Sequence, residues 1–147
     1  MSEFYVAVGD RVSFAKTVGE TDVYLFAGIT GDFAPNHVNE VYMERSGYRR
    51  RIVHGALLVG FMSAASTVAA GKARHDPEAT PVSLGYDRVR FLAPVFFGDT
   101  IVVDYCISAI DPDRLRATAD IEIRNQDGIL VAIAIHILKW VKNDNQL

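Results

Sequence analysis

The sequence predicts an α+β fold in which an antiparallel sheet wraps around one central apolar helix. Residues 52–71 contain no Asp, Glu, Lys or Arg and are apolar on every helical face, which is typical of a buried helix. The second half of the chain contains several strand-like stretches separated by turn residues, which is typical of antiparallel strands. Because the helix needs cover on every side, a sheet wrapped around it is the economical arrangement.

The composition bounds the class of protein. The chain has 147 residues, half of them hydrophobic, which favours one domain spanning residues 1–147 with a sizeable core. The net charge of −3 gives no basic field for nucleic acid, and no apolar run is long enough to cross a membrane. Cys106 is the single cysteine, which excludes an internal disulfide framework and a multi-cysteine zinc site. We therefore expect a cytoplasmic protein.

Three elements are expected in the first part of the chain. After the turn at Gly9–Asp10, residues 12–16 alternate in polarity and predict a short strand. A helix should begin at Thr21–Asp22 and close at Thr30–Gly31. Residues 38–51 are polar and irregular, and we expect a long, partly helical connection that overhangs the domain.

The remaining elements are the apolar helix and four strands. Gly55 begins the helix and Gly71 is a natural stop. Strands are predicted at residues 82–92, 100–109, 115–124 and 129–141. The last of these is apolar on both faces, which is typical of a central or doubly covered strand.

An acid and an imidazole, Asp32 and His37, lie five positions apart with Pro35 between them. The proline biases Ala34 away from helical conformation, so we expect a loop on which both side chains turn toward one pocket. An Asp beside a His can transfer protons near neutral pH. Taken alone, however, such a pair is more often a capping Asp and an ordinary loop His.

The combination of motifs changes that balance. Gly31-Asp32-x-x-Pro35-x-His37, then Ile52-Val53-His54-Gly55 at the start of the apolar helix, then Phe91-Leu92-Ala93-Pro94-Val95-x-x-Gly98-Asp99, resembles the MaoC-like dehydratase family, which includes the R-specific enoyl-CoA hydratases. The resemblance extends from about Gly9 to Trp140. It implies a hot-dog fold, a homodimer, and reversible addition of water to a trans-2-enoyl thioester to give the (3R)-hydroxyacyl thioester. The motif departs from the family pattern, because Ala34 stands where the family usually has Asn and Asn36 takes the position of an apolar residue.

The resemblance implies a role for several residues. Asp32 and His37 would be the catalytic pair that holds a water between them, and Ser63 matches a serine that supports the family's site. Gly55 lies where backbone N–H groups at a helix start are free, so it could donate to the thioester oxygen, although it could equally be a close-packing glycine. We interpret His54 as a structural histidine at the helix start. No metal and no cofactor are implied beyond the coenzyme A thioester as substrate.

One basic cluster stands out in the connection. Arg45, Arg49, Arg50 and Arg51 lie within seven positions, and a solvated loop is the ordinary explanation of such a cluster. The sharper hypothesis is that Arg49, Arg50 or Arg51 contacts the phosphates of coenzyme A or an acidic carrier protein.

Two other functions remain open. Thioesterases of the hot-dog class commonly place a carboxylate on the central helix, and residues 52–71 contain none. A non-catalytic subunit that binds acyl thioesters is disfavoured by the intact Asp32 and His37, although Ala34 keeps it open.

Charge patterning adds a prediction about assembly. Residues 100–109 carry only Asp104, and residues 129–138 carry no charged residue apart from a possible charge on His136. Exposed sheet edges are normally defended by charges, so neither stretch resembles a free edge. We therefore predict a homodimer, or a larger assembly built from it, in which two sheets join into one.

Overall fold

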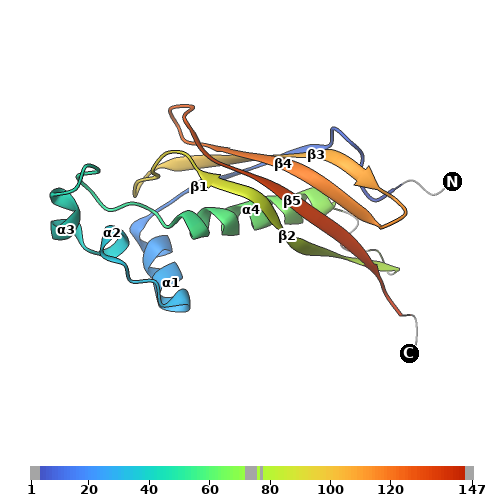
Figure 1. Cartoon of the computed structure of the whole chain (residues 1–147), viewed down its shortest axis with the longest axis horizontal. Helices are drawn as coiled ribbons and strands as arrows, with labels where there is room; N and C mark the ends of the chain where they lie inside the picture. The colour runs from blue at the N-terminus through green and yellow to red at the C-terminus, as the bar shows by residue number, and fades with distance from the viewer. Residues whose placement is uncertain (1–3, 72–75, 77, 145–147) are drawn as a thin grey trace.

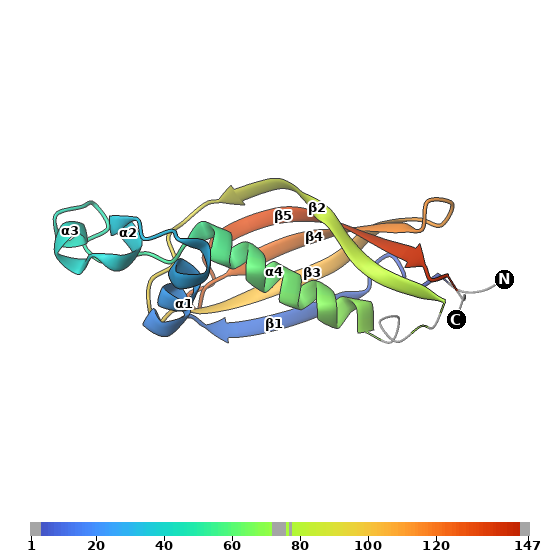
Figure 2. The same ribbon diagram turned by 90° about the horizontal axis from the view of Figure 1, so that it is seen from below.

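Five antiparallel strands form one sheet, in the order β1-β3-β4-β5-β2 (Figures 1 and 2). The structure is a computed structural model that describes residues 4–71, 76 and 78–144. The strands are β1 (Arg11–Thr17), β2 (Ala79–Phe91), β3 (Thr100–Asp111), β4 (Arg116–Arg124) and β5 (Leu130–Lys142). Each predicted strand is present, and β2 begins three residues earlier than expected.

The longest helix runs across one face of this sheet (Figure 2). The helices are α1 (Glu20–Thr30), α2 (Pro35–Val38), α3 (Glu40–Glu44) and α4 (Gly55–Ala70). Both views show α2 and α3 beyond the end of the sheet, and we call residues 35–51, which carry them, the overhang (Figures 1 and 2). The predicted helix-containing connection is thus confirmed. No helix in the described part of the chain combines the length and the apolar composition needed to cross a membrane.

The core lies between α4 and the inner face of the sheet. Alternate residues of the strands point inward, as the two-residue period requires. The inner-face residues of the three middle strands are Ile101, Val103, Tyr105, Ile107, Ala117, Ala119, Ile121, Ile123, Ala132, Ala134, His136 and Leu138. The helix contributes Leu58, Met62 and Ala65, each no more than 2% exposed. The prediction that the last strand is central is confirmed, since β5 lies between β4 and β2.

One face of α4 has no cover within the single chain. Ala56, Gly60, Ser63 and Thr67 are exposed, at spacings of three and four residues that place them along one side of the helix. The expectation of a helix covered on all sides is therefore wrong for the isolated chain. The physical reason is that the sheet packs on one side of α4, whose closest strands are β1 and β3.

The edges of the sheet also differ from expectation. Strands β3 and β5 are interior, so the low charge of residues 100–109 and 129–138 reflects burial between neighbours, and the edge argument from those residues is wrong. The edges are β1 and β2. Strand β2 carries Asp87, Arg88 and Arg90, and two register shifts interrupt its pairing with β5. Arg88 has a φ of 50°, a left-handed conformation that suits an irregular edge.

Candidate active site

Asp32 lies on a short turn that leaves α1. Gly31 ends the helix with a φ of 82°, and its N–H donates to the carbonyl of Ala27 at 2.8 Å. The Asp32 carboxylate then accepts a hydrogen bond from the backbone N–H of Ala34 through Oδ1, at 3.2 Å. This side-chain-to-backbone bond closes the turn at Ala34, the position where the family pattern has an asparagine. About half of the Asp32 side chain, 49%, remains exposed.

His37 lies on the next element and is buried. The loop predicted for residues 31–37 is present at Asp32, but at His37 the prediction is wrong, because α2 begins at Pro35. Proline favours the first position of a helix, where no N–H is needed. The Nδ1 atom of His37 is 2.8 Å from the carbonyl oxygen of Ile52. A carbonyl only accepts, so Nδ1 carries the proton in the neutral ring and Nε2 is an acceptor.

His54 joins the other two residues. Its Nε2 is 2.9 Å from the Asp32 backbone oxygen and 3.9 Å from the Asp32 carboxylate. Its ring stacks on His37, with centroids 3.7 Å apart, and also contacts the ring of Phe26 on α1. Burial lowers the pKa of His54, which keeps the ring neutral. Its Nδ1 is buried without a hydrogen-bond partner.

These three side chains form one cluster. A carboxylate oxygen of Asp32 and a ring nitrogen of each histidine lie within 4.8 Å of one another. A gap of this size between the acid and His37 suits one bridging water, bonded to both at ordinary distances. A metal fits less well. The stacked rings are 26° from parallel, whereas a tetrahedral ion needs nitrogen lone pairs that converge on one point.

A cavity of about 370 Å³ opens beside the cluster. It is lined by Asn36, His37, Tyr48, Ile52, Val53, Gly55, Leu58, Phe91, Leu92, Ala93, Pro94 and Val95. The overhang, the start of α4 and the connection after β2 all contribute to this lining. The cavity thus brings His37 and Gly55 together, as predicted. Asp32 and Ser63 are not among its lining residues.

Gly55 begins α4, so its N–H and that of Ala56 lie in the helical turn that has no intrahelical partners. The face of Gly55 where a side chain would stand is covered by the ring of Phe91. A Cβ built there would lie 2.5 Å from Phe91 Cε2 and 2.6 Å from Cδ2. The close-packing explanation of this glycine therefore has direct support. The donor role of its N–H stays a prediction.

Ser63 lies two turns further along α4, on the uncovered face. It approaches Tyr86 of β2. Burial raises the pKa of Tyr86, and the nearby hydroxyls of Ser63 and Ser83 partly oppose this rise. The Tyr86 hydroxyl nevertheless has no partner within hydrogen-bond geometry. The structure places Ser63 away from the cavity of the single chain, so its supporting role stays a prediction.

The three consecutive arginines diverge. The Arg49 guanidinium donates to the carbonyl of Glu44 at 3.4 Å, and the residue has a φ of 63°. Arg50 places its guanidinium 3.7 Å from the ring centroid of Phe96. Arg51 turns into the protein, where only 15% of its side chain is exposed. Contact with phosphates or a carrier protein stays a prediction for all three, with Arg49 and Arg50 the more accessible.

The sequence did not predict that His54 lies against both Asp32 and His37. It stands directly before Gly55, so the helix-start motif contained it, but we interpreted it as purely structural. Its stacking on His37 depends on tertiary packing between segments far apart in the chain. The lining residues Tyr48 and Phe91 were missed for the same reason, since neither has a local pattern that signals a pocket.

Comparison with known proteins adds independent evidence. A family model described as MaoC like domain matches residues 4–125. An (R)-specific enoyl-CoA hydratase from Rhodospirillum rubrum is 38% identical over 110 residues, which cover 75% of this chain and 72% of that protein. An (R)-specific enoyl-CoA hydratase from Aeromonas caviae is 28% identical over 139 residues, covering 95% of this chain and 98% of that protein.

Solved structures agree with these matches. The (R)-hydratase from A. caviae superposes with a TM-score of 0.77 at 28% identity, over 91% of this chain and 96% of that one. An R-hydratase from Pseudomonas aeruginosa in its unliganded form gives a TM-score of 0.79 at 26% identity, over 97% and 89% of the two chains. The hot-dog fold expected from the sequence is therefore confirmed.

Proposed function

This chain belongs to the MaoC-like domain family, and on that basis we propose that it adds water reversibly to trans-2-enoyl thioesters of coenzyme A or a carrier protein, giving (3R)-3-hydroxyacyl thioesters. The observation that carries the proposal is the cluster of Asp32 with His37, which lines the cavity together with Gly55 at the start of α4. The relatives named as hydratases support the same reaction class.

In the proposed mechanism the chain supplies acid–base chemistry through one pair. Asp32 and His37 hold a water between the carboxylate and Nε2. As the water oxygen bonds to C3 of the substrate, one member of the pair takes its proton, and the pair returns a proton to C2. In the dehydration direction the same groups remove the proton from C2 and protonate the leaving hydroxyl. The hydrogen bond from His37 Nδ1 to Ile52 supports this assignment, because it leaves Nε2 free to accept.

Charge on the thioester oxygen needs a second element. The negative charge that develops there is stabilised best by fixed N–H donors. We assign this role to the first N–H groups of α4, which line the cavity at Gly55 and carry the positive end of the helix dipole. In this proposal Phe91 bounds the space in which the thioester lies.

The competing functions receive less support. A hot-dog thioesterase would commonly use a carboxylate on the central helix, and α4 contains no acidic residue. A non-catalytic acyl-thioester-binding subunit would not need the Asp32 carboxylate held within 4.8 Å of two histidine nitrogens.

The decisive experiment is hydration of crotonyl-CoA, followed as loss of the conjugated enoyl absorbance. We expect turnover to the (3R)-hydroxy product, identified by chiral analysis. Release of free thiol without hydration would instead indicate a thioesterase. Binding of the thioester with neither reaction would indicate the non-catalytic subunit.

We also propose a homodimer located in the cytoplasm. The support for a dimer now comes from the edge strand β2 and the uncovered face of α4, rather than from the interior strands. A second copy that paired along β2 would extend the sheet and could cover Ser63 and its neighbours. Sedimentation at micromolar concentration should give about twice the chain mass, and an active monomer would contradict the proposal.

A further inference from the structure

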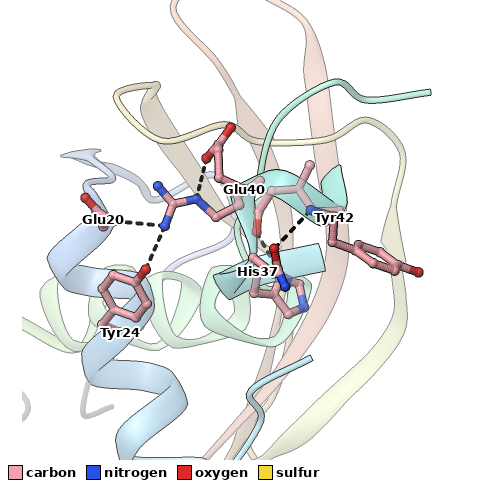
Figure 3. A network of polar contacts seen from close by, with 8 residues as sticks. Glu20, Tyr24, His37, Glu40 and Tyr42 are labelled. Carbon is pink, nitrogen blue, oxygen red and sulfur yellow. Dashed lines mark hydrogen bonds and ion pairs between the residues drawn. The ribbon is translucent and has the colours of Figure 1, made fainter. Parts of the chain in front are cut away.

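Arg51 is the centre of a polar network with Glu20, Tyr24 and Glu40, the three partners that Figure 3 labels. Its Nη1 is 2.8 Å from the Glu20 carboxylate and 2.7 Å from the Tyr24 hydroxyl, both on α1. Its Nε donates to the carboxylate of Glu40, the first residue of α3. The guanidinium also lies 4.7 Å from the ring centroid of Phe97. Arg51 thus connects α1, the overhang and the connection between β2 and β3.

The charges of this network compensate one another. Burial opposes the charge on Arg51, but hydrogen bonds to Glu20 and Glu40 outweigh it, and the pKa of Arg51 is raised. The same contact with Arg51 lowers the pKa of Glu20. One cation facing two carboxylates has no excess positive charge to offer a phosphate. Its position between them suits a structural clamp better than an anion site.

The clamp is adjacent to the groups that hold His37. The next residue, Ile52, accepts the Nδ1 hydrogen bond of His37, and its N–H donates to the carbonyl of Asn36 at 3.0 Å. Arg51 and Ile52 are therefore consecutive residues that each hold one helix of the overhang. One holds α3 through Glu40, and the other holds α2 through its backbone.

Helices α2 and α3 are too short to hold this geometry alone. Asn39 joins them directly, because it ends α2 and caps α3 by accepting from the N–H of Tyr42 at 2.9 Å (Figure 3). A movement of α3 away from Arg51 would thus be passed to the turn that carries His37. Exposed, short elements with few core contacts are the parts of a protein that open most readily.

We infer that Arg51 is a positioning residue that fixes the ring of His37 for proton transfer by tying α3 to α1. The inference rests on the proposed function, since it gives His37 a role in the reaction. It also changes the hypothesis for this arginine from a ligand contact to an internal support. In this inference Arg51 affects the reaction through the position of His37 and does not contact the substrate.

The test is Arg51→Met, which keeps much of the side-chain volume and removes the charge. We expect kcat for crotonyl-CoA hydration to fall about 10- to 100-fold, because misplacement of a reacting group by about 1 Å can cost about 100-fold. KM should change less than about twofold. The same loss should appear with crotonyl-pantetheine, which lacks the phosphates of coenzyme A. Arg114→Met is the matched control, because Arg114 pairs with Asp111 on the surface and should leave both constants unchanged.

A second measurement needs no substrate. The ¹⁵N signals of the His37 ring report which nitrogen carries the proton, and His37→Gln assigns them. Loss of the clamp should weaken the proton preference for Nδ1, whereas Arg114→Met should not. This result would stand even if crotonyl-CoA were not hydrated by the wild-type protein, so failure of the proposed function and failure of this inference are distinguishable.

Three outcomes would overturn the inference. A raised KM for crotonyl-CoA with normal behaviour toward crotonyl-pantetheine would make Arg51 a phosphate contact. Unchanged kcat with unchanged His37 signals would remove any role. If Arg51→Met does not fold, Glu40→Ala decides, because it removes the acceptor on α3 without removing the arginine. That variant should lose activity, and normal activity in it would contradict the inference.

Discussion

Two buried histidine environments in this chain differ in how the ring nitrogens are hydrogen-bonded. His37 and His54 stack at the junction of the overhang and α4, beside a cavity, and one ring nitrogen, His54 Nδ1, has no partner. His136 lies inside the sheet, fully buried, with Nδ1 2.7 Å from the Tyr105 hydroxyl and Nε2 2.8 Å from the Ser83 hydroxyl. Both environments are stabilised by stacking on a neighbouring ring.

The difference separates chemistry from structure. Both nitrogens of His136 meet hydroxyls, which can donate or accept, so either neutral form is satisfied and nothing remains for a substrate. In the stacked pair, backbone carbonyls fix one proton on each ring and leave the other nitrogen as an acceptor. Burial of a histidine is therefore a poor sign of function. An acceptor nitrogen left free beside a cavity is a better one.

The sharpest test of this contrast is Asp32→Asn, which changes the acid that faces the stacked pair. We expect activity toward crotonyl-CoA to fall about 10²–10⁴-fold, because an amide cannot take the proton that a carboxylate takes. His37→Ala should behave similarly. The double variant should lose little more than either single one, since the two groups act as a unit. Stability should change little, because half of the Asp32 side chain is exposed. Near wild-type turnover in Asp32→Asn would exclude this carboxylate from the chemistry.

A smaller effect is expected for His54→Phe. Phenylalanine retains the ring that stacks on His37 but loses the hydrogen bond to the Asp32 carbonyl. We expect kcat to fall about fivefold, which corresponds to the ordinary net value of one hydrogen bond, about 1 kcal/mol. Thermal unfolding of the variant shows whether the fold is retained. A loss as large as that of Asp32→Asn would mean that His54 itself exchanges protons with substrate.

The smallest effect on activity should come from His136→Phe, within about twofold of wild type. Its effect should appear in stability instead, as a loss of about 1–3 kcal/mol, because the Tyr105 hydroxyl is left buried without its partner. Chemical denaturation at neutral pH measures this loss. A large decrease in turnover with unchanged stability would reverse the assignment of the two histidine environments.

The pH dependence of stability separates the environments further. Burial lowers the pKa of His136 from 6.5 to about 4. Between these values the unfolded chain binds the proton and the folded chain does not, so stability falls as pH decreases from about 6.5 to about 4. The shift corresponds to roughly 3 kcal/mol at most. Wild type should therefore lose more stability than His136→Phe between pH 7 and pH 4, as denaturation midpoints at the two pH values would show.

Much of the fold was predictable because its signals are local. The absence of charged residues from 52–71 indicated α4, and strand-like stretches separated by turn residues indicated the strands. The site was predictable in part, since Asp32 and His37 belong to one short motif. Strand order was not, because pairing depends on contacts between distant segments, and so the low charge of β3 and β5 was attributed to pairing across a dimer. The inward turn of Arg51 depends on Glu20 and Glu40 reaching it from different helices, which no local pattern records.

The contact between Gly55 and Phe91 also constrains how such a sequence can diverge. A side chain at position 55 would begin 2.5 Å from the aromatic ring, so any larger residue there must be preceded by a smaller one at position 91. In the reverse order the intermediate carries a clash at the start of α4. We therefore expect the residues at the two positions to depend on each other. A change at position 91 that comes first avoids the clash, whereas a change at position 55 that comes first creates it.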